Sequence, residues 1–266
     1  MKTELESYQS GQFDLHHHLS VQTHEHTALI TLNTPPANTW DLETLTGLTQ
    51  ALAHLDQDNA IQALIITGAG RESFSAGLDL YKLQRASTQE AWRLCQQVEL
   101  AVNAIKQFRG VSIAAINGNA LGTGLECALA CDLRIAATDA QFAMPQASLG
   151  LIACANGITD LTALVGLGWA KRLLLCGERI TAERALQIGL IEQTVESGSA
   201  VGHALLLSSR IPEQSPRSIA RIKSLLRQPH TPVDARDAFT DLFGQHDAKE
   251  GIQAFLQGQP PRWKSY

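Results

Sequence analysis

Hydrophobic residues occur in short runs along the first half of the chain, and turn residues follow most of these runs. Segment 27–34 (TALITLNT) is apolar and rich in β-branched residues, and it ends at the turn sequence PPAN. The runs 62–70 (QALIITGAG), 111–118 (VSIAAING) and 133–138 (LRIAAT) have the same character. Such runs predict short buried β-strands separated by turns.

Segments with helical periodicity lie between these strands. Residues 42–58 and 90–108 carry apolar side chains at the spacing of an amphipathic helix, and residues 124–132 form a shorter helical pattern. Ser87 and Glu90 have the spacing of a capping box, which indicates the start of the second helix.

After Asp139 the pattern is mostly helical. One helix is expected at 169–180 and should end near Gly177, and a second, capped by Thr181, is expected at 182–190. A third is expected at 215–226, with Ser215 as N-cap and Pro216 in the first position. The last is expected at 234–258, with a break near Gly244. Strands that alternate with helices, followed by a helical tail of about 60 residues, predict the α/β class.

The chain has 266 residues, 44% of them hydrophobic, and a net charge of -5. This length supports one large core, or a main domain with an appendage. Without a block of Lys and Arg, a broad nucleic-acid surface or a polybasic membrane surface is not expected. The start (MKTELESYQSGQ) lacks the pattern of a signal peptide, and no apolar run reaches about 18 residues. We therefore expect a cytoplasmic protein that binds neither nucleic acid nor membrane.

Neither the cysteines nor the histidines indicate a metal site. The cysteines fall in apolar segments without zinc-ligand spacing, so we expect reduced, buried thiols at Cys95, Cys127, Cys131, Cys154 and Cys176. A mixed polar stretch before the first predicted strand holds His16, His17, His18, His24 and His26. A solvated edge is the better interpretation of that stretch.

Two glycine-containing junctions, FSAGLDL (74–80) and NGNALGTGLEC (117–127), each join a predicted strand to helix-compatible sequence. The P-loop, the complete dinucleotide fingerprint and the G-x-S-x-G motif do not occur. Free N–H groups at two such junctions could form an oxyanion hole, in which both donors stabilise a thioester enolate. Taken singly, each junction is better interpreted as an ordinary glycine turn.

Several dispersed motifs together closely resemble the crotonase family, the enoyl-CoA hydratase/isomerase superfamily. They run in one order from about Thr27 to Trp263 and read RESFSAGLDL (71–80), INGNALGTGLECALACDLRIA (116–136), AQFAMPQASLGLI (140–152), ALVGLGWAKRLLLCGERITAERALQIGLIEQTV (163–195) and FTDLFGQHDAKEGIQAFLQGQPPRW (239–263). The resemblance implies an α/β fold, with a crotonase-like spiral of ββα turns over residues 1–200. A helical C-terminal region, residues 201–266, would build a homotrimer or a dimer of trimers.

The resemblance also implies an acyl-CoA thioester as substrate and no metal or other cofactor, because coenzyme A is part of the substrate. The backbone N–H groups of Leu78 and Thr123 would be the oxyanion donors. A β-branched residue is acceptable at Thr123 only if its φ angle is negative.

Coenzyme A would contact backbone groups near Ala37, Ala76, Asp79 and Leu80. Phe255 would stack by the adenine of a neighbouring subunit, although packing between helices is an equally good interpretation of this aromatic residue. The family often has a lysine where this chain has Gly258, and Lys82 or Lys264 could replace it.

Typical hydratases of this family place two glutamates across the substrate. The first corresponds to Glu126, for which a solvated carboxylate at a helix N-terminus is the alternative interpretation. The second corresponds to Gln146. Because an amide does not exchange a proton near pH 7, Gln146 is expected to orient groups by hydrogen bonding. The segment that often reads PGAGGT reads ACANGI here, with Cys154 expected to pack and Asn156 left open.

These residues favour an enoyl-CoA hydratase or double-bond isomerase of fatty acid metabolism, with Glu126 as acid/base. Another enolate reaction of the same family, such as decarboxylation or thioester hydrolysis, is one alternative. A non-catalytic acyl-CoA binder is a second alternative. A doubly wound nucleotide-binding protein is disfavoured.

Overall fold

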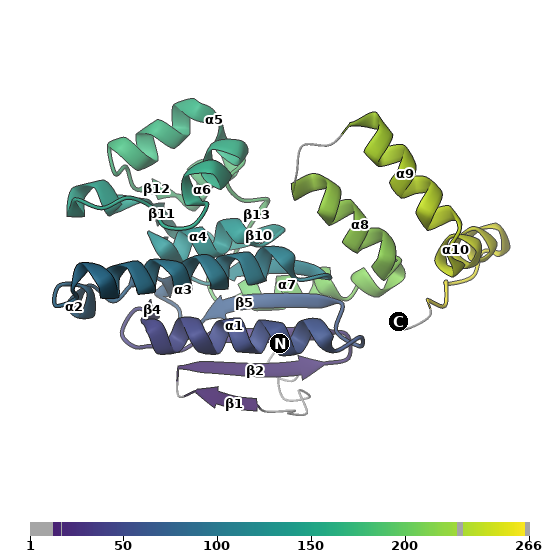
Figure 1. The fold of residues 1–266 in the computed structure, drawn as a ribbon, viewed down its shortest axis with the longest axis horizontal. Helices are drawn as coiled ribbons and strands as arrows, with labels where there is room; N and C mark the ends of the chain where they lie inside the picture. The colour runs from purple at the N-terminus through teal and green to yellow at the C-terminus, as the bar shows by residue number, and fades with distance from the viewer. Residues whose placement is uncertain (1–12, 17, 228–230, 264–266) are drawn as a thin grey trace.

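The computed structural model of the protein describes residues 13–16, 18–227 and 231–263, with side chains described from residue 18 onward (Figure 1). Its largest sheet has seven strands within these residues. In spatial order they are β1 (Phe13–His16), β2 (Leu19–His24), β3 (Thr27–Leu32), β5 (Ala63–Gly68), β8 (Val111–Ile116), β10 (Leu133–Ala137) and β13 (Gln193–Val195). The last five are parallel, whereas β1 and β2 form an antiparallel edge.

Strands of two smaller sheets alternate with these along the chain. One sheet has the order β12 (Ile180–Thr181), β11 (Gln141–Ala143), β9 (Asn119–Leu121) and β6 (Ser73–Ser75), and the other pairs β4 (Thr39–Trp40) with β7 (Gly77–Leu78). Each of β5, β8 and β10 leads into β6, β9 or β11, and helical sequence follows. This arrangement confirms the predicted α/β spiral of ββα turns.

The helices cover the sheets and extend the chain at its C-terminal end. Their bounds are α1 (Leu42–Gln57), α2 (Leu80–Leu83), α3 (Thr88–Gln107), α4 (Thr123–Ala130), α5 (Gly157–Leu175), α6 (Ala182–Gln187), α7 (Ala200–Ser208), α8 (Pro216–Arg227), α9 (Pro232–Phe243) and α10 (His246–Gln257), with 3-10 turns at Pro145–Leu149 and Ile211–Glu213. Ser87, Thr181 and Ser215 cap α3, α6 and α8 as predicted.

Two hydrophobic clusters fill the two faces of the large sheet. The larger cluster lies between this sheet and α1, α3 and α4, and it includes the fully buried Trp40 and Phe142. The smaller cluster joins Ile65 and Ile113 to Ala204 of α7. Residues that are adjacent in a strand enter different clusters, because successive side chains of a strand point to opposite faces.

Three predictions about local structure need correction. The expected helix 169–180 is the second part of α5, which begins at Gly157 and changes direction at Gly166, where φ is 72°. The mostly helical half also contains β11, β12 and β13, which are too short to give an alternating pattern. Cys95 and Cys176 are exposed rather than buried, because each lies on the solvent side of an amphipathic helix or at its end.

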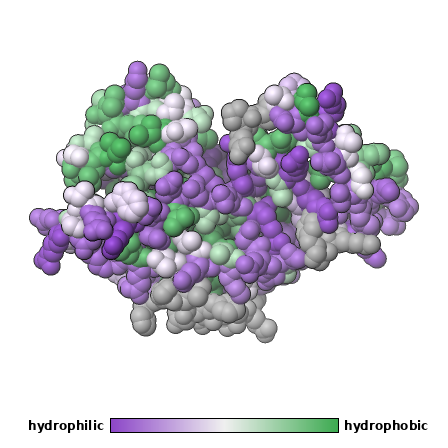
Figure 2. Space-filling model, in the orientation of Figure 1, coloured by the Kyte–Doolittle hydropathy of each residue, from purple (hydrophilic) through white to green (hydrophobic). Residues whose placement is uncertain are grey.

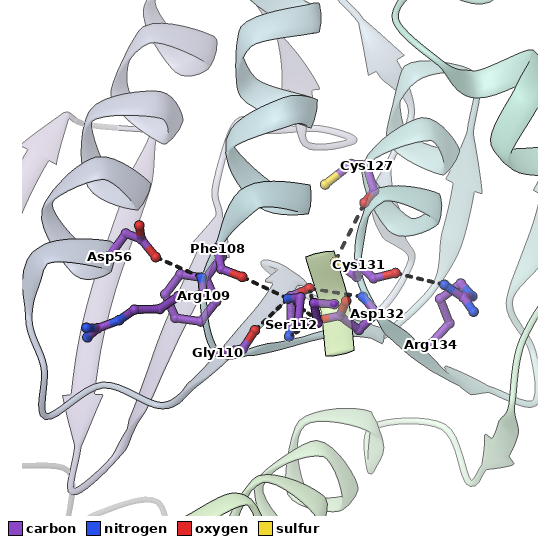
Figure 3. A network of polar contacts seen from close by, with 10 residues as sticks. Asp56, Phe108, Arg109, Gly110, Ser112, Cys127, Cys131, Asp132 and Arg134 are labelled. Carbon is purple, nitrogen blue, oxygen red and sulfur yellow. Dashed lines mark hydrogen bonds and ion pairs between the residues drawn. The ribbon is translucent and has the colours of Figure 1, made fainter. Parts of the chain in front are cut away.

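Helices α8 to α10 stand apart from the sheets in Figure 1, and one buried lysine anchors them. Lys223 of α8 is 6% exposed, and its ammonium group donates to the carbonyl oxygens of Phe108 and Gly110 and to the carboxylate of Asp132. Asp132 also accepts the N–H of Ser112 at 2.7 Å. Figure 3 shows these oxygen-bearing residues gathered between β8 and the end of α4.

The predicted division at residue 200 falls at the start of α7, which lies on the large sheet, and it stays a prediction. No helix of the described residues is long and apolar enough to cross a membrane. The same residues contain no group of three His, Cys, Asp or Glu side chains that could hold a metal ion. Strands β1 and β2 place His16 and His24 at an edge of the large sheet, and His17 lies outside the described residues.

Candidate active site

The two glycine junctions meet in the folded chain. Gly77 has φ 85°, and a Cβ atom at this position would lie 2.9 Å from the Thr123 nitrogen and 3.0 Å from the Leu121 oxygen. Only glycine therefore fits here, both for its backbone conformation and for the contact. The junctions are thus one structural unit rather than two separate turns.

Two further contacts hold this unit together. The buried hydroxyl of Ser75 donates to the carbonyl of Asn38 at 2.7 Å and accepts the N–H of Gly77 at 3.0 Å. A Cβ atom at Gly124 would lie 2.3 Å from the Ser75 carbonyl oxygen, so glycine lets α4 rest directly on this strand end. The turn before Leu78 and the first turn of α4 are consequently fixed against each other.

The two proposed oxyanion donors belong to this unit. The N–H of Asp79 donates to the carbonyl of Trp40 at 2.9 Å, and successive N–H groups of an extended strand alternate in direction, so the N–H of Leu78 points away from β4. Thr123 is the first residue of α4, where an N–H has no acceptor within the helix. Thr123 is not among the residues with a positive φ angle, so its β-branched side chain is acceptable at this position.

Glu126 lies one turn further along α4 and is 1% exposed. Its Oε1 accepts the backbone N–H of Cys154 at 3.1 Å. The Gln146 amide donates to the same oxygen at a long 3.4 Å. The alternative interpretation of Glu126 as a solvated surface carboxylate is therefore wrong.

Burial raises the pKa of Glu126 to about 8. The negative charge of Asp160 adds to this rise, while hydrogen bonds from the Cys154 and Gly157 backbones oppose it. A carboxyl group with such a pKa is mostly protonated at pH 7, and it can both release and accept a proton near neutral pH. Such a shift in pKa is typical of groups that transfer protons in active sites.

Gln146 fills the space between Glu126 and the start of α4. A Cβ atom at Gly122 would lie 3.7 Å from its Nε2. Its Oε1 is buried and accepts no hydrogen bond within the described part of the chain. The amide therefore offers one donor to Glu126 and one acceptor to a bound molecule.

The positions assigned to coenzyme A lie along the edge formed by β4 and β7. The N–H of Ala76 already donates to the carbonyl of Ala37 at 2.9 Å. Asp79 caps α2 by accepting backbone N–H groups of that helix, and Leu80 is exposed. These roles leave the Ala37 N–H, the Ala76 carbonyl and the Leu80 side chain for a ligand, and the assignment stays a prediction.

The basic and aromatic positions considered for coenzyme A have different surroundings in the single chain. Phe255 is 85% exposed on α10, so it does not pack between helices here. Gly258 ends α10 at φ 65°, a conformation that a lysine would rarely adopt. Lys82 forms an ion pair with Asp41, and although burial opposes the change, this contact lowers the pKa of Asp41 to about 2. Lys264 lies outside the described residues.

The roles of three residues at this site were missed or misread in the sequence. Cys154 was expected only to pack, yet its backbone holds Glu126. A Cβ atom at Gly157 would lie 2.7 Å from the Glu126 Oε2. The only sequence signal for Cys154 and Gly157 was that their segment reads ACANGI where the resemblance leads us to expect PGAGGT. Ser75 had no signal beyond its place in FSAGLD.

Comparisons with known proteins agree with the fold. The family model described as "Enoyl-CoA hydratase/isomerase" matches residues 22–266. The crotonyl-CoA hydratase of Syntrophomonas wolfei is 34% identical over 89% of this chain and 94% of that protein. The 2,3-dehydroadipyl-CoA hydratase of Escherichia coli is 35% identical over 92% of this chain and 98% of that protein.

A solved structure of Pseudomonas aeruginosa DspI is also similar. It is 49% identical in sequence and has a TM-score of 0.92, with 96% of this chain and 100% of that chain covered. The similarity thus extends through the C-terminal helices as well as the sheets.

Proposed function

This chain belongs to the enoyl-CoA hydratase/isomerase family, and we propose that it interconverts a 2-enoyl-CoA and a 3-hydroxyacyl-CoA with Glu126 as its only proton-transfer carboxyl group. The observation that carries this proposal is the buried Glu126, with a pKa of about 8, one turn beyond the Thr123 amide. The names of the two hydratase relatives support a CoA thioester with a 2,3 double bond.

The proposed reaction begins with the thioester oxygen between the N–H groups of Leu78 and Thr123. Ionised Glu126 takes a proton from water while the water oxygen bonds to C3, and the thioester becomes an enolate held by the two donors. Glu126, now protonated, gives this proton to C2 and regenerates the thioester. One carboxyl group is sufficient, because the first step leaves on Glu126 the proton that the second step needs.

Gln146 is proposed to orient the water rather than to transfer a proton. Its unused Oε1 is an acceptor for a water O–H, and its amide nitrogen faces Glu126. A water bound in this way would have one proton directed at Gln146 and the other at Glu126.

Double-bond isomerisation is the second candidate, because Glu126 is a buried carboxyl group with a raised pKa and this reaction needs no second carboxyl group to activate water. Moving a double bond from the 3,4 to the 2,3 position takes one proton from C2 and returns it to C4, and no water enters the product. A single group with a pKa near 8 can carry out both transfers.

Incubation in water labelled with oxygen-18 separates the two candidates. Hydration of crotonyl-CoA places the label in the product, whereas isomerisation of a 3-enoyl-CoA gives an unlabelled product. Glu126→Gln should abolish either reaction. Retention of full activity by a folded Glu126→Gln protein would overturn the assignment, and binding without turnover of any enoyl-, malonyl- or hydroxyacyl-CoA would favour the non-catalytic binder.

We also propose that the C-terminal helices join copies of the chain in a trimer or a dimer of trimers. Large apolar side chains are exposed on these helices, at Ile222, Leu226, Phe239, Phe243, Ile252, Phe255 and Leu256. Figure 2 shows hydrophobic surface at the end of the molecule formed by α10. Such a surface supports contact with another copy. A monomer at micromolar concentration in sedimentation would contradict this proposal.

A further inference from the structure

A cleft of about 560 Å³ lies between the C-terminal helices and the large sheet. Gln62 and Gly110, which directly precede β5 and β8, line one side of this cleft, and residues of α8 and of the end of α9 line the other. Its volume is within the range of roughly 300–1,000 Å³ that sites for small molecules occupy.

The cleft and the candidate active site lie at opposite ends of the same parallel strands. The cleft adjoins the starts of β5 and β8, whereas the two glycine junctions come after the ends of these strands. Each strand has six residues and therefore spans about 20 Å. A molecule in the cleft would thus leave Glu126 and the two oxyanion donors accessible to a substrate.

Positive charge gathers in the cleft, although the whole chain has a net charge of -5. Arg109, Arg217 and Arg221 line it, and Asp241 is the one acidic residue in its lining within the described part of the chain. Arg221 and Asp241 are 4.0 Å apart, and the Asp241 side chain is 76% exposed. Because such an exposed pair contributes little, the cleft keeps an excess of positive charge.

One face of α8 presents two of these arginines to the cleft. Arg217, Arg221 and Ser224 are four and then three residues apart, so they share that face. A helix face that is turned toward the body of a protein ordinarily carries apolar side chains, yet both arginines here are half-buried. Ile222 and Leu226, which are proposed to contact another copy, do not line the cleft.

Arg109 is held in place by neutral groups. Its guanidinium group donates to the backbone carbonyl of Asp58 and to the side-chain oxygen of Asn59. Figure 3 shows its side chain extending away from the polar cluster around Ser112. These contacts fix the position of the guanidinium group without neutralising its charge.

We propose that the cleft binds an amphiphilic oxyanion, an alkyl chain that ends in a carboxylate or a phosphate group. Arginine binds both head groups through paired N–H donors, and the three arginines hold the head group. The alkyl chain packs against the apolar part of the lining, which consists of Ile61, Ile219, Ala220 and Leu242. A molecule bound in this way contacts both α8 and the starts of β5 and β8, so it holds the C-terminal helices against the sheet.

The test is calorimetric titration of the full-length protein with decanoate, decyl phosphate, 1-decanol and inorganic phosphate, each below its micelle concentration. Saturable binding of decanoate, of decyl phosphate or of both is expected, and their comparison identifies the head group. Decanol should bind at least about tenfold more weakly, as for the loss of a hydrogen bond to a charged group. Each CH₂ removed from the chain should weaken binding by up to about fourfold.

Three results of these titrations would overturn the inference. The first is the lack of saturable binding of both anionic amphiphiles. The second is binding of decanol as tight as that of the anions, and the third is binding of inorganic phosphate as tight as that of decyl phosphate.

Variants locate the binding in the cleft. Arg217→Gln and Arg221→Gln, singly and together, should weaken binding of the anionic amphiphile by at least about tenfold, whereas Asp241→Asn should strengthen it. Arg227→Gln is the matched control, because Arg227 is an exposed arginine of the same helix that does not line the cleft. Thermal unfolding without ligand checks the fold of each protein. Parent-like affinity in the folded double variant would contradict the assignment.

A final titration separates the cleft from the candidate active site. Excess crotonyl-CoA should leave the affinity for the amphiphile unchanged, and displacement by crotonyl-CoA would place the amphiphile in the active site and overturn the inference. If binding depends on Arg217 and Arg221 in a protein that hydrates no enoyl-CoA, the cleft site stands and the proposed function fails.

Discussion

Gly157 lies directly against the carboxyl group of Glu126: a Cβ atom at Gly157 would be 2.7 Å from both the Cγ and the Oε2 of the glutamate. The first residue of α5 therefore forms one wall of the space that the carboxyl group occupies. The absence of a side chain at Gly157 therefore leaves room for the Glu126 carboxyl group.

Gly157→Ala should displace Glu126 and lower kcat/KM for the proposed reaction by on the order of 10²-fold, the scale of an acid/base contribution. Gly168→Ala in the same helix is the matched control, because a Cβ atom there meets nothing within 4 Å. The control should keep full activity and gain stability of up to about 1 kcal/mol. Steady-state kinetics and thermal unfolding of both proteins measure these effects, and equal activity in the two variants would contradict the role of Gly157.

Thr123→Pro should abolish turnover, since proline removes one N–H and is tolerated at the first position of a helix. The control is Thr88→Pro, which occupies the same position in α3 behind a Ser87 that is already extended at φ -71° and ψ 163°. Loss of one oxyanion donor typically costs about 2.7–4 kcal/mol in the barrier. Turnover by a folded Thr123→Pro protein at the parent rate would exclude this amide as a donor.

Gln146→Glu should place a second carboxyl group beside Glu126 with almost no change in volume. If the site descends from a two-carboxylate hydratase, hydration of crotonyl-CoA should rise by on the order of 10²-fold. The two carboxyl groups would interact, so the pH–rate profile should become bell-shaped. The measurement is kcat/KM across the pH range in which the fold is stable. No gain at any pH, with CoA affinity intact, would instead favour Gln146 as the native group for its reaction.

The raised pKa of Glu126 makes stability depend on pH in a defined direction. The folded protein keeps the Glu126 proton up to about pH 8, whereas an unfolded glutamate loses it near about pH 4.3. The folded state binds more protons between these values, so this group's contribution is full below about pH 4.3 and is lost as pH rises through 8. The loss at pH 7 is roughly 4 kcal/mol.

Glu126→Gln should therefore raise the melting temperature, and the gain should be larger at pH 8 than at pH 5. Glu99→Gln, at an exposed position of α3, should show no such difference. Thermal unfolding of the three proteins at the two pH values gives the comparison. A gain that is independent of pH would mean that Glu126 is ionised in the folded protein at both values.

The helix ends and the buried strands could be predicted because their signals are local. Ser87 and Glu90 define a capping box within four residues of sequence, and both hydrogen bonds of that box are present. The β11, β12 and β13 strands were missed because two or three residues carry no periodicity, and pairing with distant strands decides their conformation.

The surroundings of Glu126 show which contacts could not be predicted from the sequence. Resemblance to a family indicated the position of Glu126 and the absence of a second glutamate at Gln146. The contact of the Cys154 backbone with Glu126 joins residues 28 positions apart, and no local pattern records such a contact. It depends on how the segment before α5 packs against α4, which is a property of the whole fold.

The buried ammonium of Lys223 also bears on the order in which the chain assembles. Its acceptors at Phe108 and Asp132 are 115 and 91 residues earlier in the sequence, and they form a single site only after β8 has taken its place beside the end of α4. Burying the charged lysine before that site exists would cost free energy without compensating hydrogen bonds. We therefore expect α8 to join a nearly finished core, which is also the order in which a ribosome releases the two parts.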